Sequence, residues 1–315
     1  MDISIVVPVY NEQENIALLV EEIEQVLSNL DNKEYEMIFV NDGSVDGTKD
    51  KLKELTTKYS SLKAINLRKN FGQTSAMVAG FDQALGNVII SMDGDRQNDP
   101  RDIPNLLIKI DEGYDIVSGW RKDRKDNLVS RRLPSIIANK IISIATGVQL
   151  HDYGCSLKAF KQEVIKNTDL YGEMHRFIPA VASWMGVSLT EIEVNHRPRM
   201  AGVSKYGISR TTRVILDLIT VKFLLSFSTK PIQIFGSWGL GSLTTGLLLS
   251  LMVIIQRIFW AIPANRPLFT VAIMLILAGL QFICFGLIAE ILIRMYHEST
   301  NKPIYAIKDI ASHKQ

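Results

Sequence analysis

The sequence has few cysteines and little net charge, and each shortage excludes a class of protein. It contains 2 cysteines among 315 residues, Cys155 and Cys284, which excludes a disulfide scaffold and favours a reducing compartment. The 35 basic and 33 acidic side chains leave a formal net charge of +2, so we expect no nucleic-acid partner. A hydrophobic content of 47% excludes a disordered chain.

Two nucleotide-binding signatures and a secretion signal are also missing from the sequence. There is no GxxxxGKS segment and no GxGxxG after the first apolar run, which disfavours P-loop hydrolysis and ordinary dinucleotide binding. The first residues, MDISIVVPVYNE, lack a basic region followed by an apolar one. We therefore expect no secretory signal and expect the first 200 residues to stay in the cytoplasm.

The mean hydropathy of +0.11 is high for a soluble protein, and the excess lies in two uncharged runs near the C-terminus. They extend from Pro231 to Gln256 and from Pro267 to Ala289, and each exceeds the roughly 20 residues that a membrane-crossing helix needs. Buried core helices are the alternative, but core helices of this length normally carry a polar face. The sequence therefore predicts a hairpin over 230–293, with transmembrane helices at about 231–256 and 267–290.

Basic residues flank this hairpin on the side that its two ends share. They are Arg210, Arg213, Lys222 and Lys230 before it and Arg294, Lys302 and Lys308 after it. This pattern favours a multi-pass protein of the inner (plasma) membrane, with both flanks cytoplasmic and a cytoplasmic tail at 294–315, although Arg257 and Arg266 weaken the asymmetry. Residues 211–229 are apolar with charges at helical spacing, which predicts an interfacial amphipathic helix, with a core helix as the alternative.

Residues 1–210 alternate between strand and helix patterns. We expect strands at Ile3–Val9, Tyr35–Val40, Leu62–Leu67 and Asn87–Met92, and helices at Glu14–Leu30, Asp46–Tyr59 and Gly72–Leu85. Asp46 or Thr48 is the expected cap of the second helix. Short links between such elements predict an α/β fold with a mostly parallel sheet and helices on both faces. Ligands bind such sheets beyond the carboxyl ends of the strands.

Polar clusters follow three of these strands, at residues 8–12 (PVYNE), 41–48 (NDGSVDGT) and 93–100 (DGDRQNDP). A single Asp-Gly pair has an alternative interpretation as a simple turn, but three clusters at one sheet edge indicate a ligand crevice. Asp93 and Asp95 alternate along an extended segment, so both carboxylates can address one site. With Gln97 they offer hard oxygen ligands suited to Mg²⁺ or Mn²⁺, whose shell a substrate diphosphate would complete.

The segments PVYNE, VNDGSVDGT, RKNFGQ and DGDRQNDP, in this order, resemble the motifs of family 2 glycosyltransferases of the GT-A (Rossmann-like) fold, over about residues 1–210. The resemblance implies a catalytic domain that uses a divalent cation and a nucleotide-diphosphate sugar and inverts the anomeric centre. It implies a nucleotide-sugar pocket formed by Pro8, Tyr10, Glu12, Asp42, Gly72 and Asp93. It also implies that Asp93 and Asp95 form a catalytic DxD pair, with Asp95 and Gln97 nearest the metal. Gly94 and Arg96 stand at positions that vary in the family.

Two further segments narrow the resemblance. Residues 151–156 (HDYGCS) are similar to the DYGC segment of undecaprenyl-phosphate sugar transferases, and residues 197–206 (RPRMAGVSKY) contain the RxxGxSKY loop shared with dolichyl-phosphate mannose synthases. The hairpin resembles that of bacterial polyprenyl-phosphate glucosyltransferases. The resemblance implies transfer of a hexose, glucose being the first expectation, from a UDP-sugar to polyprenyl (undecaprenyl) phosphate in the lipid bilayer.

Other functions stay open at this point. They are the same reaction with GDP-mannose or a UDP-amino sugar, and a non-catalytic membrane scaffold. A homo-oligomer is a further open expectation. A processive polysaccharide synthase is disfavoured because no QxxRW segment and no additional apolar spans are present.

A polyprenyl phosphate acceptor is already anionic near neutral pH, so it requires cationic side chains more than a strong base. The candidates for acceptor-phosphate binding are Arg121, Arg131, Arg132, Arg199 and Lys205. Their alternatives are a solvated charged loop at 121–132 and a simple tether at 197–206. The resemblance adds weight to Arg121 and Arg131. Asp152 is a candidate catalytic residue that orients the acceptor, orders a cationic partner or acts as a base, with capping of the turn before Gly154 as the structural alternative.

Overall fold

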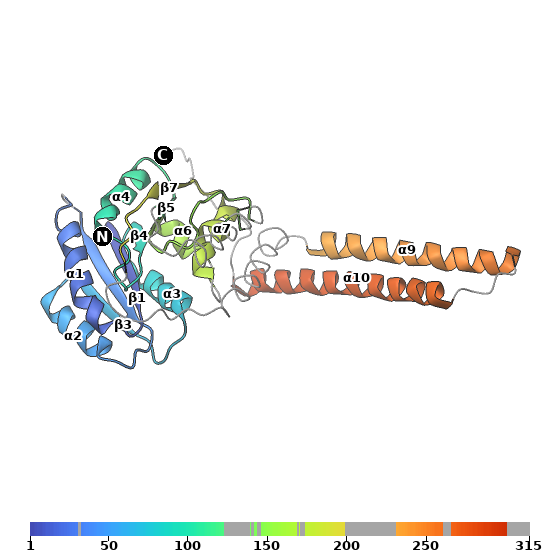
Figure 1. Cartoon of the computed structure of the whole chain (residues 1–315), viewed down its shortest axis with the longest axis horizontal. Coiled ribbons are helices and arrows are strands. Elements are labelled where there is room, and N and C mark those ends of the chain that lie inside the picture. Colours follow the sequence, from blue (N-terminus) through green and yellow to red (C-terminus); the bar gives the residue numbers. More distant parts are fainter. Residues whose placement is uncertain are drawn as a thin grey trace, which may run out of the picture. The chain divides into compact units, whose positions relative to one another are not determined.

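The computed structural model of the chain divides into two compact units, Met1–Val221 and Lys222–Gln315 (Figure 1). The structure describes residues 1–30, 33–122, 139, 142–143, 146–168, 170, 174–198, 231–260 and 266–300. The interfacial helix expected at 211–229 and four of the acceptor-phosphate candidates lie outside these residues. Those candidates are Arg131, Arg132, Arg199 and Lys205.

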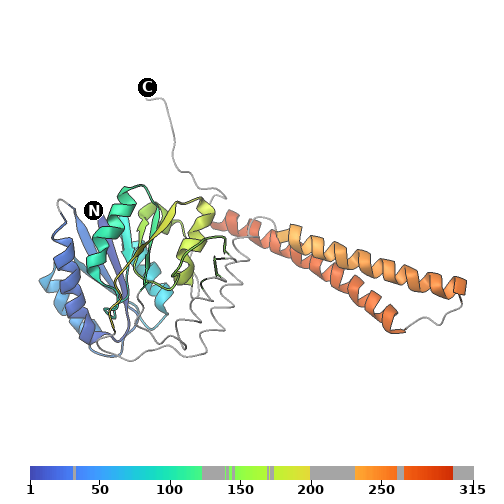
Figure 2. The ribbon, with the colours of Figure 1, turned by 45° about the horizontal axis from the view of Figure 1, so that its top comes forward.

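A seven-stranded sheet in the order β3-β2-β1-β4-β6-β5-β7 forms the centre of the first unit (Figure 2). The strands are β1 (Ile3–Val9), β2 (Tyr35–Asn41), β3 (Leu62–Asn66), β4 (Val88–Ser91), β5 (Ile116–Trp120), β6 (Lys158–Lys161) and β7 (Leu189–Glu193). Strand β6 is antiparallel to both neighbours, and the other described pairs are parallel. The expected mostly parallel α/β sheet is confirmed.

The helices of this unit are α1 (Gln13–Leu27), α2 (Thr48–Lys58), α3 (Gln73–Gln83), α4 (Ile103–Asp111), α6 (Gln162–Lys166) and α7 (Ile178–Ala182), with short 3₁₀ turns η1 (Pro100–Asp102), η3 (Met174–Phe177) and η4 (Ser183–Met185). The three predicted helices are present with shifted ends. Asp46 lies before α2 rather than in it, and its carboxylate accepts the Thr48 N–H at 3.0 Å while Gly47 is the N-cap. The expected capping group is therefore Asp46, placed one residue before the N-cap.

Helices cover both faces of the sheet, and its strands β1 and β2 are buried along nearly their whole length. Ile5 and Val7 of β1 belong to the core cluster that α1 joins through Ile16 and Leu19. On the opposite face α3 lies directly on β1, where a Cβ on Gly80 would come within 2.3 Å of the Val6 side chain. Near-continuous burial of this kind is typical of parallel strands between helical layers.

Strands β2, β1 and β4 are adjacent and parallel, so their carboxyl ends lie at one edge of the sheet. The Asp42 N–H donates to the Val9 carbonyl at 2.9 Å, which joins the ends of β2 and β1. The chain leaves β1 toward β2 and β3 on one side and returns to β4 on the other. This reversal creates the topological switch point at which open α/β sheets bind ligands.

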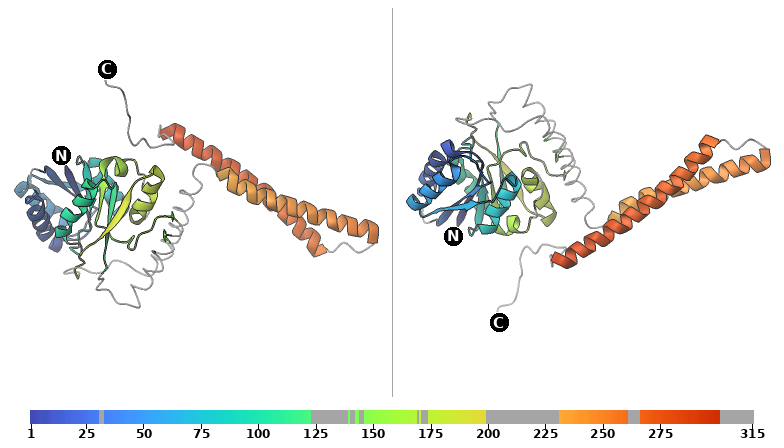
Figure 3. Two further views of the ribbon diagram at one scale, coloured as in Figure 1. Left: turned by 90° about the horizontal axis from the view of Figure 1, so that it is seen from above. Right: turned by 90° about the horizontal axis from the view of Figure 1, so that it is seen from below.

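The second unit contains two long helices, α9 (Pro231–Trp260) and α10 (Arg266–Thr300), which lie side by side (Figure 3). Ile232–Phe259 and Pro267–Leu292 are long and apolar enough to cross a membrane, and only 17% of each most apolar window is buried, unlike a soluble core helix. The Ser242 hydroxyl donates to the Leu275 carbonyl at 2.8 Å across the pair. Helix α10 continues to Thr300, beyond the end of this apolar span.

Candidate active site

The loop after β4 carries the two aspartates of the DGD segment at the switch point. The Gln73 side-chain amide donates to Asp93 Oδ1 at 2.8 Å, and Asp95 Oδ1 accepts the Gln97 N–H at 3.1 Å. Burial and the neighbouring Asp95 charge raise the pKa of the Asp93 carboxyl. Two carboxylates that repel each other in a buried place form an arrangement that a cation stabilises.

This loop packs tightly against the end of β1. A Cβ on Gly94 would lie 2.6 Å from Val9 Cγ1 and 3.3 Å from the Pro8 carbonyl oxygen, so the close approach requires glycine. Arg96 adopts a positive φ of 61°, which is uncommon for a residue other than glycine. The sharp turn between Asp95 and Gln97 therefore depends on an arginine in the left-handed conformation.

Asp42 connects the end of β2 to the segment before α3. Its carboxylate accepts the Phe71 N–H at 2.7 Å and the Gly72 N–H at 2.9 Å. Burial raises the pKa of Asp42, and these two backbone hydrogen bonds oppose that rise. Since Gln73 follows directly and binds Asp93, a continuous set of hydrogen bonds joins Asp42 to the DGD loop.

The loops after β1 and β2 also contact each other. The Asn11 N–H donates to Ser44 Oγ at 2.9 Å, and the Glu12 N–H donates to Thr48 Oγ1 at 3.0 Å. The Glu12 carboxylate accepts from the Asn15 amide at 2.6 Å. Tyr10 is half-buried at the same edge of the sheet. The structure thus brings together the segments that carry all the predicted nucleotide-sugar residues.

A buried ion pair joins the end of β5 to the DYGC segment. Arg121 Nε donates to Asp152 Oδ2 at 2.7 Å and Nη2 donates to Oδ1 at 3.0 Å, while the Gly154 N–H also donates to Oδ1. The two side chains are 12% and 4% exposed. Burial alone would lower the pKa of Arg121, but its contacts with Asp152 hold it above the ordinary value. Asp152 is therefore engaged with a cationic partner and also caps the turn before Gly154.

Sequence reasoning missed a buried lysine beside this pair. Lys158 on β6 is 2% exposed, and its ammonium donates to the carbonyls of Tyr153 and Cys155. Burial lowers the pKa of Lys158 and raises that of the Cys155 thiol, and both cysteines are free. The segment KAFK carries no local signal for this role, because the partners come from a neighbouring turn.

Comparison with known proteins fits this geometry. Residues 4–168 match the sequence model of glycosyl transferase family 2. The chain belongs to this family. It is 41% identical over 315 residues to a dodecaprenyl-phosphate galacturonate synthase from Rhizobium johnstonii, a match that covers 98% of this chain and 93% of that protein. It is 36% identical to an undecaprenyl-phosphate 4-deoxy-4-formamido-L-arabinose transferase from Shewanella sediminis, over 98% of this chain and 92% of that protein.

Solved structures with little sequence similarity show the same fold. Glucosyl-3-phosphoglycerate synthase from Mycobacterium tuberculosis, crystallised with Mn²⁺, UDP and phosphoglyceric acid, superposes with a TM-score of 0.56. The match covers 70% of this chain and 77% of that one at 14% identity, so it supports the GT-A fold alone.

The oxygen atoms that this family 2 chain offers after β4 suit a divalent cation that a substrate also coordinates. Within the parts of the chain that the structure describes, no group of three or more His, Cys, Asp or Glu side chains is placed to hold a metal. Asp93 and Asp95 supply two carboxylates, and Gln97 is half-buried next to them. Mg²⁺ and similar ions are often held by one or two carboxylates, with substrate phosphates and water in the other positions.

Proposed function

We propose that the protein transfers a sugar from a UDP-sugar to polyprenyl phosphate, with inversion at the anomeric carbon. The observation that carries this proposal is the placement of Asp93 and Asp95 at the switch point of a family 2 sheet in a chain that also has two membrane-length apolar helices. Relatives that match 98% of the chain are named as polyprenyl-phosphate sugar transferases.

In this proposal the loops at the carboxyl edge of the sheet bind the donor. Pro8, Tyr10, Glu12, Asp42 and Gly72 line the nucleotide-sugar pocket. Asp93 and Asp95, with Gln97, hold the divalent cation against the diphosphate. A bound Mg²⁺ or Mn²⁺ supplies positive charge that stabilises the departing diphosphate.

The acceptor phosphate is held by cationic groups on the other side of the reacting carbon. Arg121 is the described member of this set, and Arg131, Arg199 and Lys205 complete the proposal. Asp152 takes two of the five guanidinium N–H donors of Arg121 and so fixes its orientation. We therefore assign Asp152 the role of ordering a cationic partner, since a phosphate that is already anionic needs no strong base.

The finer proposals concern the sugar and the membrane. Glucose remains our first expectation for the hexose, whereas the relatives name galacturonate and 4-deoxy-4-formamido-L-arabinose. A few hydrogen bonds decide such selectivity. We further propose that the hairpin spans the inner membrane with the catalytic unit cytoplasmic. Reporter fusions after Ser228 and at Gln315 are both expected to give cytoplasmic signals, and a periplasmic C-terminus would contradict the hairpin.

A transfer assay on the full-length chain in lipid nanodiscs tests the proposal. Radiolabelled UDP- and GDP-sugars are supplied with undecaprenyl phosphate and with Mg²⁺, Mn²⁺ or EDTA. We expect lipid-linked label from a UDP-sugar that EDTA abolishes. If no donor gives labelled lipid under any metal condition, the result contradicts transferase function and favours a scaffold. If only a GDP-sugar gives labelled lipid, the donor is a GDP-sugar rather than a UDP-sugar.

A further inference from the structure

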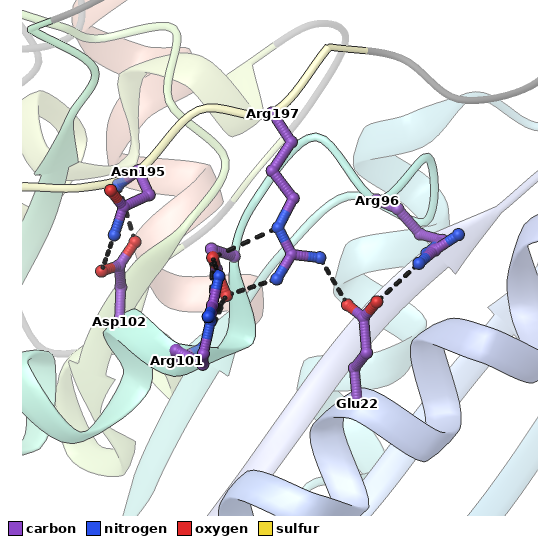
Figure 4. Close-up of polar contacts among 7 residues, drawn as sticks. Glu22, Arg96, Arg101, Asp102, Asn195 and Arg197 are labelled. Atoms are coloured by element: carbon purple, nitrogen blue, oxygen red, sulfur yellow. Dashed lines mark hydrogen bonds and ion pairs between the residues drawn. The ribbon is translucent and has the colours of Figure 1, made fainter.

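Three arginines and two carboxylates form one ion network around the loop that carries Asp95 and Gln97 (Figure 4). We call it the Glu22 network; it consists of Glu22, Arg96, Asp99, Arg101 and Arg197. Its centre is a single carboxylate on helix α1, a helix that contributes no residue to the donor pocket proposed above. Among the residues that the structure describes, Glu22 is connected to the loop through the two arginines that it binds.

The first arginine lies within the loop itself. Arg96 Nη2 donates to Glu22 Oε1 at 2.5 Å, and the Arg96 side chain is 14% exposed. Its Nε is buried and has no hydrogen-bond partner among the described residues, so Glu22 supplies an important polar contact of this guanidinium. The positive φ of 61° costs conformational free energy that surrounding contacts must offset. Because Arg96 stands between Asp95 and Gln97, its backbone angles set the directions of both proposed ligands.

The second arginine approaches from the segment after β7. Arg197 Nη1 donates to Glu22 Oε2 at 2.7 Å, and Arg197 Nη2 donates to Asp99 Oδ1 at 2.6 Å. The Arg197 backbone N–H also donates to the Gln97 carbonyl at 2.9 Å. The far end of the loop is thus tied to Arg197 through both main chain and side chain.

The segment that carries Arg197 is itself held in register. Asn195 donates to both oxygens of the Asp102 carboxylate, at 2.7 Å from its backbone and 2.9 Å from its side chain. His196 forms an antiparallel bridge with Asn98. Residues 195–197 and the loop therefore behave as one unit, and Figure 4 shows Arg197 reaching from this segment toward Glu22.

We propose that Glu22 is a positioning residue that presets the Asp95–Gln97 loop for a divalent cation bound together with a nucleotide diphosphate. Its two oxygens hold one arginine on each side of the loop, so the ligand geometry exists before the cation arrives. Without the Glu22 charge, two neighbouring guanidiniums lose their shared counter-ion and repel each other. The inference rests on the proposed function, because it takes Asp95 and Gln97 as cation ligands.

The test compares Glu22→Gln with Glu24→Gln in the full-length chain. Glu24 is a half-buried carboxylate of the same helix that accepts hydrogen bonds from Tyr35 and Ser61, away from the loop. Mn²⁺ is titrated at fixed UDP, with the free ion followed by electron paramagnetic resonance. Loss of an outer partner of a metal ligand commonly weakens metal affinity by about 10- to 100-fold. We expect a rise of about tenfold or more in the half-saturating Mn²⁺ concentration for Glu22→Gln, and parental values for Glu24→Gln.

A second readout separates positioning from a general loss of structure. In the transfer assay, Glu22→Gln is expected to need more Mn²⁺ for half-maximal rate yet to approach the parental rate at saturating Mn²⁺. Glu22→Asp, which keeps the charge, is expected to recover part of the affinity. If Glu22→Gln does not fold, Arg197→Lys decides, since a lysine cannot bridge Glu22 and Asp99 simultaneously as the guanidinium does.

Each outcome decides between the two proposals. Parental Mn²⁺ affinity in Glu22→Gln, or equal losses in Glu22→Gln and Glu24→Gln, overturns the positioning role and leaves the transferase proposal intact. Parental affinity in Arg197→Lys overturns it in the same way. A parental chain that neither binds Mn²⁺ with UDP or GDP nor transfers sugar overturns the proposed function, and the inference falls with it.

Discussion

Replacing Asp152 by asparagine isolates the energy of the buried pair with Arg121. The substitution keeps the side-chain volume but removes the charge that faces a guanidinium only 12% exposed, in a pair whose carboxylate is 4% exposed. Removing one partner of a buried ion pair typically costs about 3–5 kcal/mol. Asp93 also attracts Arg121 and offsets part of the loss, so we expect the lower end, about 3 kcal/mol.

This free energy translates into a measurable shift of the melting temperature. For a unit of this size, 1 kcal/mol corresponds to about 2–4 °C, so Asp152→Asn is expected to lower Tm by roughly 6–12 °C. Thermal unfolding of the detergent-solubilised full chain, followed by near-UV circular dichroism, measures the shift.

The matched control is the neighbouring pair of Lys122 and Glu193. Its nitrogen and oxygen are 2.5 Å apart, but the side chains are 55% and 57% exposed. Exposed pairs contribute little, so Glu193→Gln is expected to move Tm by less than about 3 °C. If Asp152→Asn unfolds within 2 °C or so of the parent, or if both variants shift equally, the assignment of a buried, strongly coupled pair is refuted.

Three further predictions address the metal, the pH dependence and the hairpin. Asp95→Asn is expected to abolish transfer at ordinary Mg²⁺ or Mn²⁺ concentrations with an unchanged Tm, because one formal charge on the metal is lost at constant volume; retained transfer removes Asp95 from the site. Burial alone would raise the pKa of Asp115, but the hydrogen bond from Lys161 at 2.8 Å helps to hold this pKa below 3.8. The parent is therefore expected to be more stable than Asp115→Asn above pH 3.8, and this advantage should disappear as the pH falls below that value. Thermal unfolding of both proteins between pH 6 and pH 3 measures this advantage, and a stability difference that does not change with pH contradicts the ion pair of Asp115 with Lys161. A Cβ on Gly239 would lie 2.8 Å from a carbonyl oxygen of α10, whereas one on Gly241 meets no atom of the described segments within 4 Å. Gly239→Val should therefore lower Tm and Gly241→Val should not, and equal effects would argue against close packing of the two helices.

Much of the fold was predictable because its elements follow local rules. The four N-terminal strands were predicted, and one of them, Ile3–Val9, is an apolar run rich in β-branched residues, which suits a parallel strand buried on both faces. Strand β6 was not predicted. Its four residues, KAFK, have no strand signature of their own, and only pairing with β4 and β5 makes them a strand. The helix ends shifted by one to three residues because capping depends on neighbouring loops, as the contact of Asp46 with Thr48 shows.

Some residues of the candidate site were likewise predictable from the sequence, and others were not. The aspartates of the DGD loop and Asp42 were predictable because a turn at the end of a strand places polar groups at the ligand edge of the sheet. Gln73 stands within a recognised motif, yet its contact with Asp93 is evident only because the tertiary structure brings the first residue of α3 to the loop after β4. Glu22 and Lys158 had no local signal at all.

The sequence by itself determined the elements and residue types of this protein: alternating apolar runs, carboxylates after strands, and two uncharged segments of membrane length. Tertiary structure alone decided which charges meet. Glu22 is separated by 74 residues from Arg96 and by 175 from Arg197, yet one carboxylate binds both. Strand and helix patterns are visible within a few residues, because apolar side chains recur with the period of each element. The electrostatic contacts that orient the site join residues distant in sequence, and they exist only after the sheet has brought its loops together.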